Sequence, residues 1–255
     1  MNVPVTTALD AGVLTISFAR PEKKNALTDA MYGVVADALD DAQTNDAVRV
    51  VLFRGEGDSF SAGNDIGDFV AAAMGNPAGM NVFRVLKALA HFDKPVVAAV
   101  KGSAVGIGTT LLLNADMVFV AEDARLSTPF VNLALAPEAA SSILLPARIG
   151  HARAFSMFAL GEVVSGKDAA AWGIANAALP VDKVDAAAAN AAAELAKRAP
   201  KSLQLTKRLM RDGAALWAHM EEENKAFGGQ LSSPEAREAF TAFVERRAPD
   251  FSKAS

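Results

Sequence analysis

Residues 94–116, KPVVAAVKGSAVGIGTTLLLNAD, carry the pattern that decides the fold. The run from Val96 to Val100 is continuously apolar, which is typical of a strand buried on both faces. SAVGIG (103–108) predicts a turn, and TTLLLNAD (109–116) predicts the start of a helix. Buried strands that alternate with helices in this way indicate an α/β fold with right-handed crossovers.

The same alternation extends on both sides of this stretch. GVLTISFARP (12–21), VRVVLFRG (48–55) and MVFVAED (117–123) predict further strands, and a helix is expected over residues 82–90. Thr28 can cap another helix, whose apolar face is formed by Met31, Val34, Val35, Ala38, Leu39 and Ala42. The predicted organisation is therefore an α/β core over residues 1–185.

From about residue 185 the pattern becomes helical. Helices are predicted over 184–200, 201–213, most of 216–229 and 232–247, so residues 186–255 are expected to form a helical region beside the core. Its helices carry apolar faces larger than a surface appendage needs, formed by Leu203, Leu205, Leu209, Met210, Phe240 and Phe243. These faces favour self-association.

Composition excludes several classes of function. The net charge of −4 argues against nucleic acid as a partner, and the absence of cysteine excludes disulfides and thiolate metal sites. His91, His151 and His219 show no metal-ligand spacing, so no metal site is predicted. No secretion signal and no membrane-spanning run are found, and a cytoplasmic location is expected.

Two glycine-bearing loops follow buried strands and are candidates for a binding site. They are SFSAGND (59–65) and GSAVGIGTT (102–110). Two backbone N–H groups converging there would form an oxyanion hole, whereas the alternative is a pair of tight turns needed for packing. Residues 71–81, AAAMGNPAGMN, are small and are expected to form a mobile segment.

Glu138 is the only charged residue between Arg125 and Arg148. A carboxylate in such apolar surroundings is costly to bury unless something compensates it. One interpretation is a helix-start residue, because Pro137 and Glu138 suit the first two positions of a helix. The other is a general base whose pKa is raised by burial.

Several motifs in order resemble the crotonase family, the enoyl-CoA hydratase/isomerase superfamily. They are FSAGNDI (60–66), KPVVAAVKGSAVGIG (94–108), SGKDAAAWGIANAALP (165–180) and AFTAFVERRAPDF (239–251). The resemblance implies a spiral of ββα units followed by a helical trimerisation region, and hence a homotrimer or homohexamer. It also implies an acyl-CoA substrate, with coenzyme A as part of the substrate and no further cofactor.

The resemblance assigns the site residue by residue. The backbone N–H groups of Asn64 and Ile107 would form the oxyanion hole. RPEKKNAL (20–27) and the stretch around Ala62 would border the coenzyme A, where Lys23 and Lys24 supply positive charge. The expected substrate-binding residues are Lys23, Lys24, Ala26, Ala62, Gly63, Asp65, Ile66, Gly106, Phe130 and Leu135. Phe130 and Leu135, together with Met74, Met80 and Phe83, would line the acyl pocket.

Departures from the hydratase pattern narrow the predicted activity. The two glutamates of a family hydratase align with Thr110 and Phe130, which cannot perform acid–base chemistry on water. Residues 127–142, STPFVNLALAPEAASS, together with SAGND (61–65), look like the peroxisomal-type Δ3,Δ2-enoyl-CoA isomerases. In that branch a single glutamate, here Glu138, is the acid–base residue. The alternatives are a hydratase, hydrolase or dehalogenase-like enzyme, or a catalytically silent acyl-CoA-binding protein.

Overall fold

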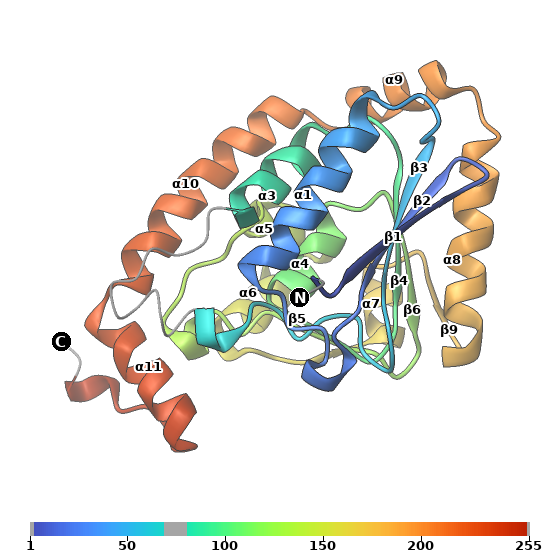
Figure 1. Cartoon of the computed structure of the whole chain (residues 1–255). Coiled ribbons are helices and arrows are strands. Elements are labelled where there is room, and N and C mark those ends of the chain that lie inside the picture. The colour runs from blue at the N-terminus through green and yellow to red at the C-terminus, as the bar shows by residue number, and fades with distance from the viewer. Residues whose placement is uncertain (1–2, 69–80, 254–255) are drawn as a thin grey trace.

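The computed structural model describes residues 3–68 and 81–253 and contains a large central sheet (Figure 1). In these ranges the sheet has the order β1-β2-β3-β4-β6-β9. Its strands are β1 (Val5–Asp10), β2 (Val13–Phe18), β3 (Val50–Gly55), β4 (Val96–Val100), β6 (Met117–Ala121) and β9 (Ala177–Leu179). β1 and β2 are antiparallel, and every later pair in the sheet is parallel.

Apolar sequence explains the middle of this sheet. Every residue of β4 is buried, and β3 is buried except at Arg54, as expected for strands covered on both faces. The helices α1 (Asp29–Thr44) and α3 (Asn81–His91) lie on one side, and α8 (Val181–Ala196) lies on the other (Figure 1). The four predicted strands are present as β2, β3, β4 and β6, and the α/β fold is confirmed.

A second, smaller sheet has the order β5-β7-β8 in the described part of the chain. Its strands are β5 (Ser103–Val105), β7 (Arg125–Ser127) and β8 (Val164–Ser165). β4 leads into β5 and then α4 (Ile107–Leu113), and β6 leads into β7 and then α5 (Ser141–Ile149). This repeated step is the expected ββα unit, but SAVGIG is not merely a turn, because its first half pairs with β7.

The described ranges contain five further α-helices. They are α6 (His151–Leu160), α7 (Gly166–Trp172), α9 (Pro200–Met210), α10 (Gly213–Leu231) and α11 (Pro234–Glu245), with short 3-10 turns at Pro21–Lys23, Val131–Leu133 and Phe251–Lys253. The expected boundary at residue 185 falls inside α8, which packs against β3, β4 and β6. α10 and α11 extend away from the large sheet (Figure 1).

Two local expectations have clear outcomes. Thr28 does cap α1, where its side chain accepts a hydrogen bond from the backbone of Met31. The interpretation of Glu138 as a first-turn helix residue is wrong, because α5 begins only at Ser141. The chain makes a separate turn at Ala139 and Ala140 before the helix starts.

Candidate active site

A short parallel pairing brings the two glycine-bearing loops together. Ser61 pairs with Ala104: the N–H of Ser61 donates to Ser103 and the N–H of Val105 donates to Ser61, both at 3.0 Å. Asn64 lies three residues after Ser61, Ile107 lies three residues after Ala104, and both line the same pocket. The register of the pairing is therefore what places these two backbone segments side by side.

Gly63 allows this close approach. Its φ of +90° is one that side chains disfavour, and a Cβ atom there would lie 2.7 Å from the carbonyl oxygen of Val105. The same loop also pairs with the backbone at Leu27: the N–H of Leu27 donates to the carbonyl of Gly63, and the N–H of Asp65 donates to the carbonyl of Leu27. Asn64 is thus fixed between two neighbouring backbone segments.

The N–H groups of Asn64 and Ile107 are available to a ligand. Within the described ranges, neither N–H donates a hydrogen bond to another residue. The side chain of Asn64 is engaged separately, because its Oδ1 accepts a hydrogen bond from the hydroxyl of Tyr32. Two unused donors on one pocket are the arrangement that an oxyanion hole requires.

Tyr32, on α1, was not identified from the sequence. Burial raises the pKa of its hydroxyl well above the ordinary value, and the negative charges of Glu138, Asp68 and Asp29 raise it further. The hydroxyl therefore stays protonated and donates to Asn64. In the sequence, Tyr32 is one aromatic residue in an amphipathic helix, and such residues usually belong to the hydrophobic core. No local pattern therefore marked it as part of a site.

Glu138 is 6% exposed and reaches the site from the segment before α5. Its Oε1 accepts a hydrogen bond of 2.5 Å from the hydroxyl of Thr110 on α4. Burial raises the pKa of Glu138 to about 8, the hydrogen bond from Thr110 opposes that rise, and the charge of Glu223 adds to it. A carboxyl group with a pKa near neutrality can both accept and return a proton.

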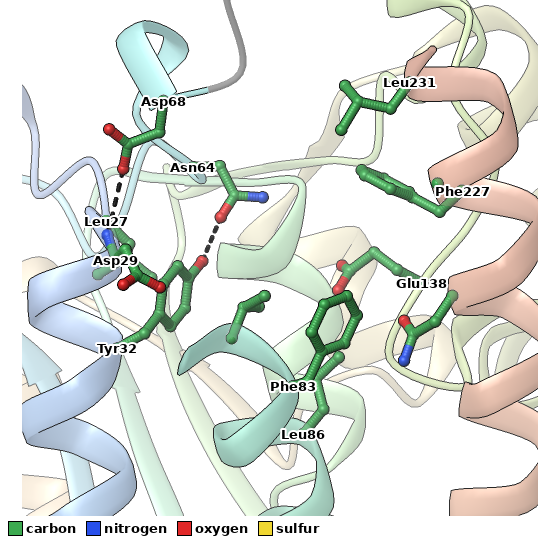
Figure 2. A pocket seen from close by; sticks show the side chains of 13 residues that line it. Leu27, Asp29, Tyr32, Asn64, Asp68, Phe83, Leu86, Glu138, Phe227 and Leu231 are labelled. Carbon is green, nitrogen blue, oxygen red and sulfur yellow. Dashed lines mark hydrogen bonds between the residues drawn. The ribbon is translucent and has the colours of Figure 1, made fainter. Parts of the chain in front are cut away.

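Glu138 lies in an apolar pocket (Figure 2), which is called the acyl pocket below after the expectation from the sequence. Tyr32 and Asn64 are on one side of it, and Phe227 and Leu231 of α10 are on the other. The remaining lining residues are Leu27, Asp29, Asp68, Val82, Phe83, Leu86, Asn224 and Gly228. Most of the lining surface is apolar, and its polar groups come from Asp29, Tyr32, Asn64, Asp68, Glu138 and Asn224.

A second pocket, here named the loop pocket, shares Asn64 and Phe227 with the first. It contains seven further residues predicted from the resemblance: Ala26, Ala62, Gly63, Ile66, Gly106, Phe130 and Leu135, as well as Ile107. Arg247, which lies just after the end of α11, also lines this pocket. The sequence prediction thus identifies half of this lining, nine of its 18 residues, although it did not separate the two pockets.

Some predicted residues have other positions. Lys23 and Lys24 are exposed and do not line the loop pocket, but the carbonyl of Lys24 accepts the N–H of Ala62, which does. Asp65 forms an ion pair of 2.6 Å with Arg20. Partial burial raises the pKa of Asp65, but the hydrogen bonds from Arg20 and Gly67 outweigh this effect and hold it below its ordinary value.

The residues expected to line one acyl pocket are divided between the two pockets. Phe83 lines it, whereas Phe130 and Leu135 line the loop pocket and pack with Ala236 and Phe240 of α11. The reason is the 3-10 turn at Val131–Leu133, which directs this segment toward α11. Met74 and Met80 lie outside the described residues.

In residues 3–68 and 81–253, no three acidic or histidine side chains gather in a way that could hold a metal ion. No helix in these ranges has the length and apolar composition needed to cross a membrane.

Comparison with known proteins agrees with this architecture. The family model described as enoyl-CoA hydratase/isomerase matches residues 8–254. The structure of Pseudomonas aeruginosa OdaA superimposes with a TM-score of 0.91 at 46% identity, covering 96% of this chain and all of that one.

Two curated relatives carry different activities in their names. Enoyl-CoA delta isomerase 2 of Rattus norvegicus is 34% identical over 93% of this chain, which spans 62% of that relative. The probable enoyl-CoA hydratase of Bacillus subtilis is 30% identical over 97% of this chain and 98% of its own length. The motifs, the ββα fold and these matches together lead to one conclusion: the chain belongs to the enoyl-CoA hydratase/isomerase family.

Proposed function

We propose that this enzyme shifts the double bond of a 3-enoyl-CoA to give the 2-trans-enoyl-CoA, with Glu138 as its single acid–base residue. The observation that carries the proposal is the position of Glu138. It is a buried carboxyl group with a pKa of about 8, and its pocket also contains Asn64 of the candidate oxyanion hole.

The chemistry needs one proton moved between two carbon atoms. Glu138 takes the proton from C2, and the electrons of that C–H bond move toward the thioester carbonyl to form a dienolate. The N–H groups of Asn64 and Ile107 hydrogen-bond the negative oxygen, each contributing about 3–4 kcal/mol to the transition state by analogy with other oxyanion holes. Glu138 then returns the proton at C4, so atoms and charge balance.

The residues at the hydratase positions support isomerisation over hydration. Thr110 has no carboxylate and uses its hydroxyl to hold Glu138. Phe130 packs against Phe158, with ring centroids 6.0 Å apart. Neither side chain can activate or protonate water.

Three other carboxylates, those of Asp65, Asp68 and Asp116, are less suited to act as the base. Asp65 is paired with Arg20, and Asp116 is paired with Lys207 at 2.7 Å. Asp68 lines the acyl pocket but is exposed, and it accepts the backbone N–H of Asp29. Asp68 therefore provides the control carboxylate for substitutions of Glu138, because both line the same pocket.

Turnover measurements with Glu138→Gln and Asp68→Asn test the proposal. Glu138→Gln should reduce kcat on 3-enoyl-CoA by roughly 10²–10⁴, the usual scale for a general base, whereas Asp68→Asn should stay near wild type. The wild type should hydrate 2-enoyl-CoA poorly and should not hydrolyse saturated acyl-CoA. Isomerase turnover that survives in Glu138→Gln, or efficient hydration by the wild type, would overturn the assignment. Tight binding without turnover would indicate a silent acyl-CoA-binding protein.

We further propose that the loop pocket takes the coenzyme A moiety, with Lys23 and Lys24 beside it. Replacing both lysines by Glu should weaken binding of an acyl-CoA, most strongly at low ionic strength, because exposed charges are screened by salt. Lys167 and Lys183, exposed lysines paired with Glu122 and Asp182, offer a control with the same charge change. Equal loss in both double variants would mean that only net charge matters.

A further inference from the structure

The turn after Glu138 has an unusual backbone. Ala139 and Ala140 have φ values of +62° and +58°, in the left-handed region that residues other than glycine rarely adopt. Two such residues in succession persist only where the surroundings hold them. Since they follow Glu138 directly, whatever holds this turn also determines where the carboxyl group of Glu138 lies.

One side of the turn is held by α4. Asn114 donates from its side-chain nitrogen to the carbonyl of Ala139 at 3.0 Å. Thr110, four residues earlier and within α4, donates to the side chain of Glu138. Asn114 caps the C-terminal end of α4, so one helix and its cap residue hold both the carboxyl group and the backbone that follows it.

The other side of the turn is held by Glu223 of α10, which is only 7% exposed. Its carboxylate accepts the N–H of Ala140 at 2.6 Å and the N–H of Ser142 at 2.9 Å. It also accepts the hydroxyl of Ser142 at 2.5 Å, and Nε2 of His219 lies 3.5 Å away. A buried carboxylate with several donors is compensated, and it supplies acceptors for N–H groups at the start of α5.

We propose that Glu223 is the positioning residue of the isomerase reaction: from α10 it holds the Ala139–Ala140 turn and so aims Glu138 into the acyl pocket. This proposal rests on the proposed function of Glu138. It gives the C-terminal helical region a part in the active site besides any role in assembly. Glu223 does not line the acyl pocket, so it acts through Glu138.

Charge provides a second effect of the same residue. The negative charge of Glu223 contributes to the raised pKa of Glu138. The other titratable groups that line the pocket around Glu138 are Tyr32, Asp29 and Asp68, and His219 is adjacent to Glu223. Removing the charge of Glu223 alone should therefore lower the pKa of Glu138 and move the acid limb of the pH–rate profile to lower pH.

The experiment compares Glu223→Gln, Glu223→Asp and Glu222→Gln on 3-enoyl-CoA over a range of pH. Gln loses the charge and one acceptor, so kcat should fall roughly 10- to 100-fold with little change in KM, the cost of a misplaced catalytic group. The acid limb should also move to lower pH. Asp keeps the charge on a shorter side chain, so kcat should fall while the limb stays in place.

Glu222→Gln is the matched control, because Glu222 is the neighbouring residue on α10 and forms its ion pair with exposed Lys225. It should behave as wild type. If Glu223→Gln lowered the unfolding temperature but left kcat and the acid limb unchanged, Glu223 would be merely structural. If Glu223→Gln failed to fold, Glu223→Asp would still decide, and normal kcat in that variant would overturn the proposal.

A measurement that does not depend on turnover tests this proposal separately from the proposed isomerase function. The infrared C=O band of protonated Glu138, assigned by its loss in Glu138→Gln, reports the titration of this group directly. A titration that moves to lower pH in Glu223→Gln, in an enzyme that does not isomerise, would reject the isomerase function while keeping the coupling. A band that titrates as in wild type, in an active isomerase, would reject the coupling alone.

Discussion

The hydroxyl of Thr110 donates a hydrogen bond of 2.5 Å to Oε1 of Glu138. The sequence resemblance implies that Thr110 stands where a family hydratase has its first catalytic glutamate. Instead of supplying a second carboxylate, the side chain of Thr110 therefore orients the carboxylate of Glu138. The bond favours the charged form of Glu138 and so opposes the increase in pKa that burial causes.

Replacing Thr110 by Val keeps the shape of the side chain and removes this donor. The pKa of Glu138 should rise, so less of the enzyme has the basic form at neutral pH, and the acid limb of kcat/KM should move to higher pH. A hydrogen bond to a charged group is worth about 1.5–3 kcal/mol, so kcat/KM at pH 7 should fall roughly 10-fold or more. Thr110→Ser keeps the hydroxyl and should retain the wild-type limb. The same profile in all three proteins would contradict the role of the bond.

Glu138 should also make stability depend on pH. Its pKa is 4.5 in an ordinary environment and about 8 in the folded protein. Between these values the unfolded chain binds fewer protons, so the free energy of unfolding falls as pH rises, by at most about 1.4 kcal/mol per pH unit. Glu138→Gln removes this loss and should unfold at a higher temperature than wild type near pH 8, with a smaller difference near pH 4.5. Glu222→Gln, at an exposed position, should not show this gain, and equal pH dependence in wild type and Glu138→Gln would contradict the raised pKa.

The long apolar strands and the capped helix could be predicted because their signals are local. β3 and β4 are continuous buried runs, and Thr28 precedes the apolar face of α1. β8 has two residues and β5 and β7 have three each, so they have no periodicity to detect and exist through their pairing.

The turn at Glu138 could not be predicted for a different reason. Pro137 and Glu138 match the start of a helix, yet Ala139 and Ala140 adopt the left-handed region at a cost of roughly 1–2 kcal/mol each. Asn114 and Glu223, which hold that turn, are 25 and 83 residues away in sequence. The isolation of Glu138 in the sequence correctly indicated a special residue, whereas its conformation depends on contacts between distant segments.

Self-association remains a prediction, and the structure narrows which surface would carry it. Phe240 is buried within the chain against Phe130 and Leu135, so it belongs to the core beside the loop pocket. Leu209 and Met210 at the end of α9 are 80% and 82% exposed. We expect light scattering at micromolar concentration to show a trimer or hexamer, and Leu209→Lys with Met210→Lys to shift it toward the monomer. A wild-type monomer would refute the assembly.

Gly228 should set the room for the acyl chain. It lies in the interior of α10, where glycine costs about 0.5–1 kcal/mol relative to Ala, and it lines the acyl pocket. Among the described residues, and apart from its chain neighbours and the backbone of its own helix, a Cβ atom there would meet no atom within 4 Å, so larger side chains have space that substrate would otherwise use. Gly229 has equally open surroundings but does not line the pocket, which makes it a matched control.

We therefore expect Gly228→Leu to reduce kcat/KM for long-chain 3-enoyl-CoA and to spare short-chain substrates. Each methylene excluded from an apolar pocket loses about 0.8 kcal/mol, or roughly a fourfold reduction per methylene. Gly229→Leu adds the same side chain one position away and should leave the chain-length profile unchanged. Both variants replace a helical glycine, so a gain in thermal stability should be common to the two. If both shifted the profile equally, or neither did, the acyl chain would not pass along α10, and the assignment of this pocket to the acyl group would fail.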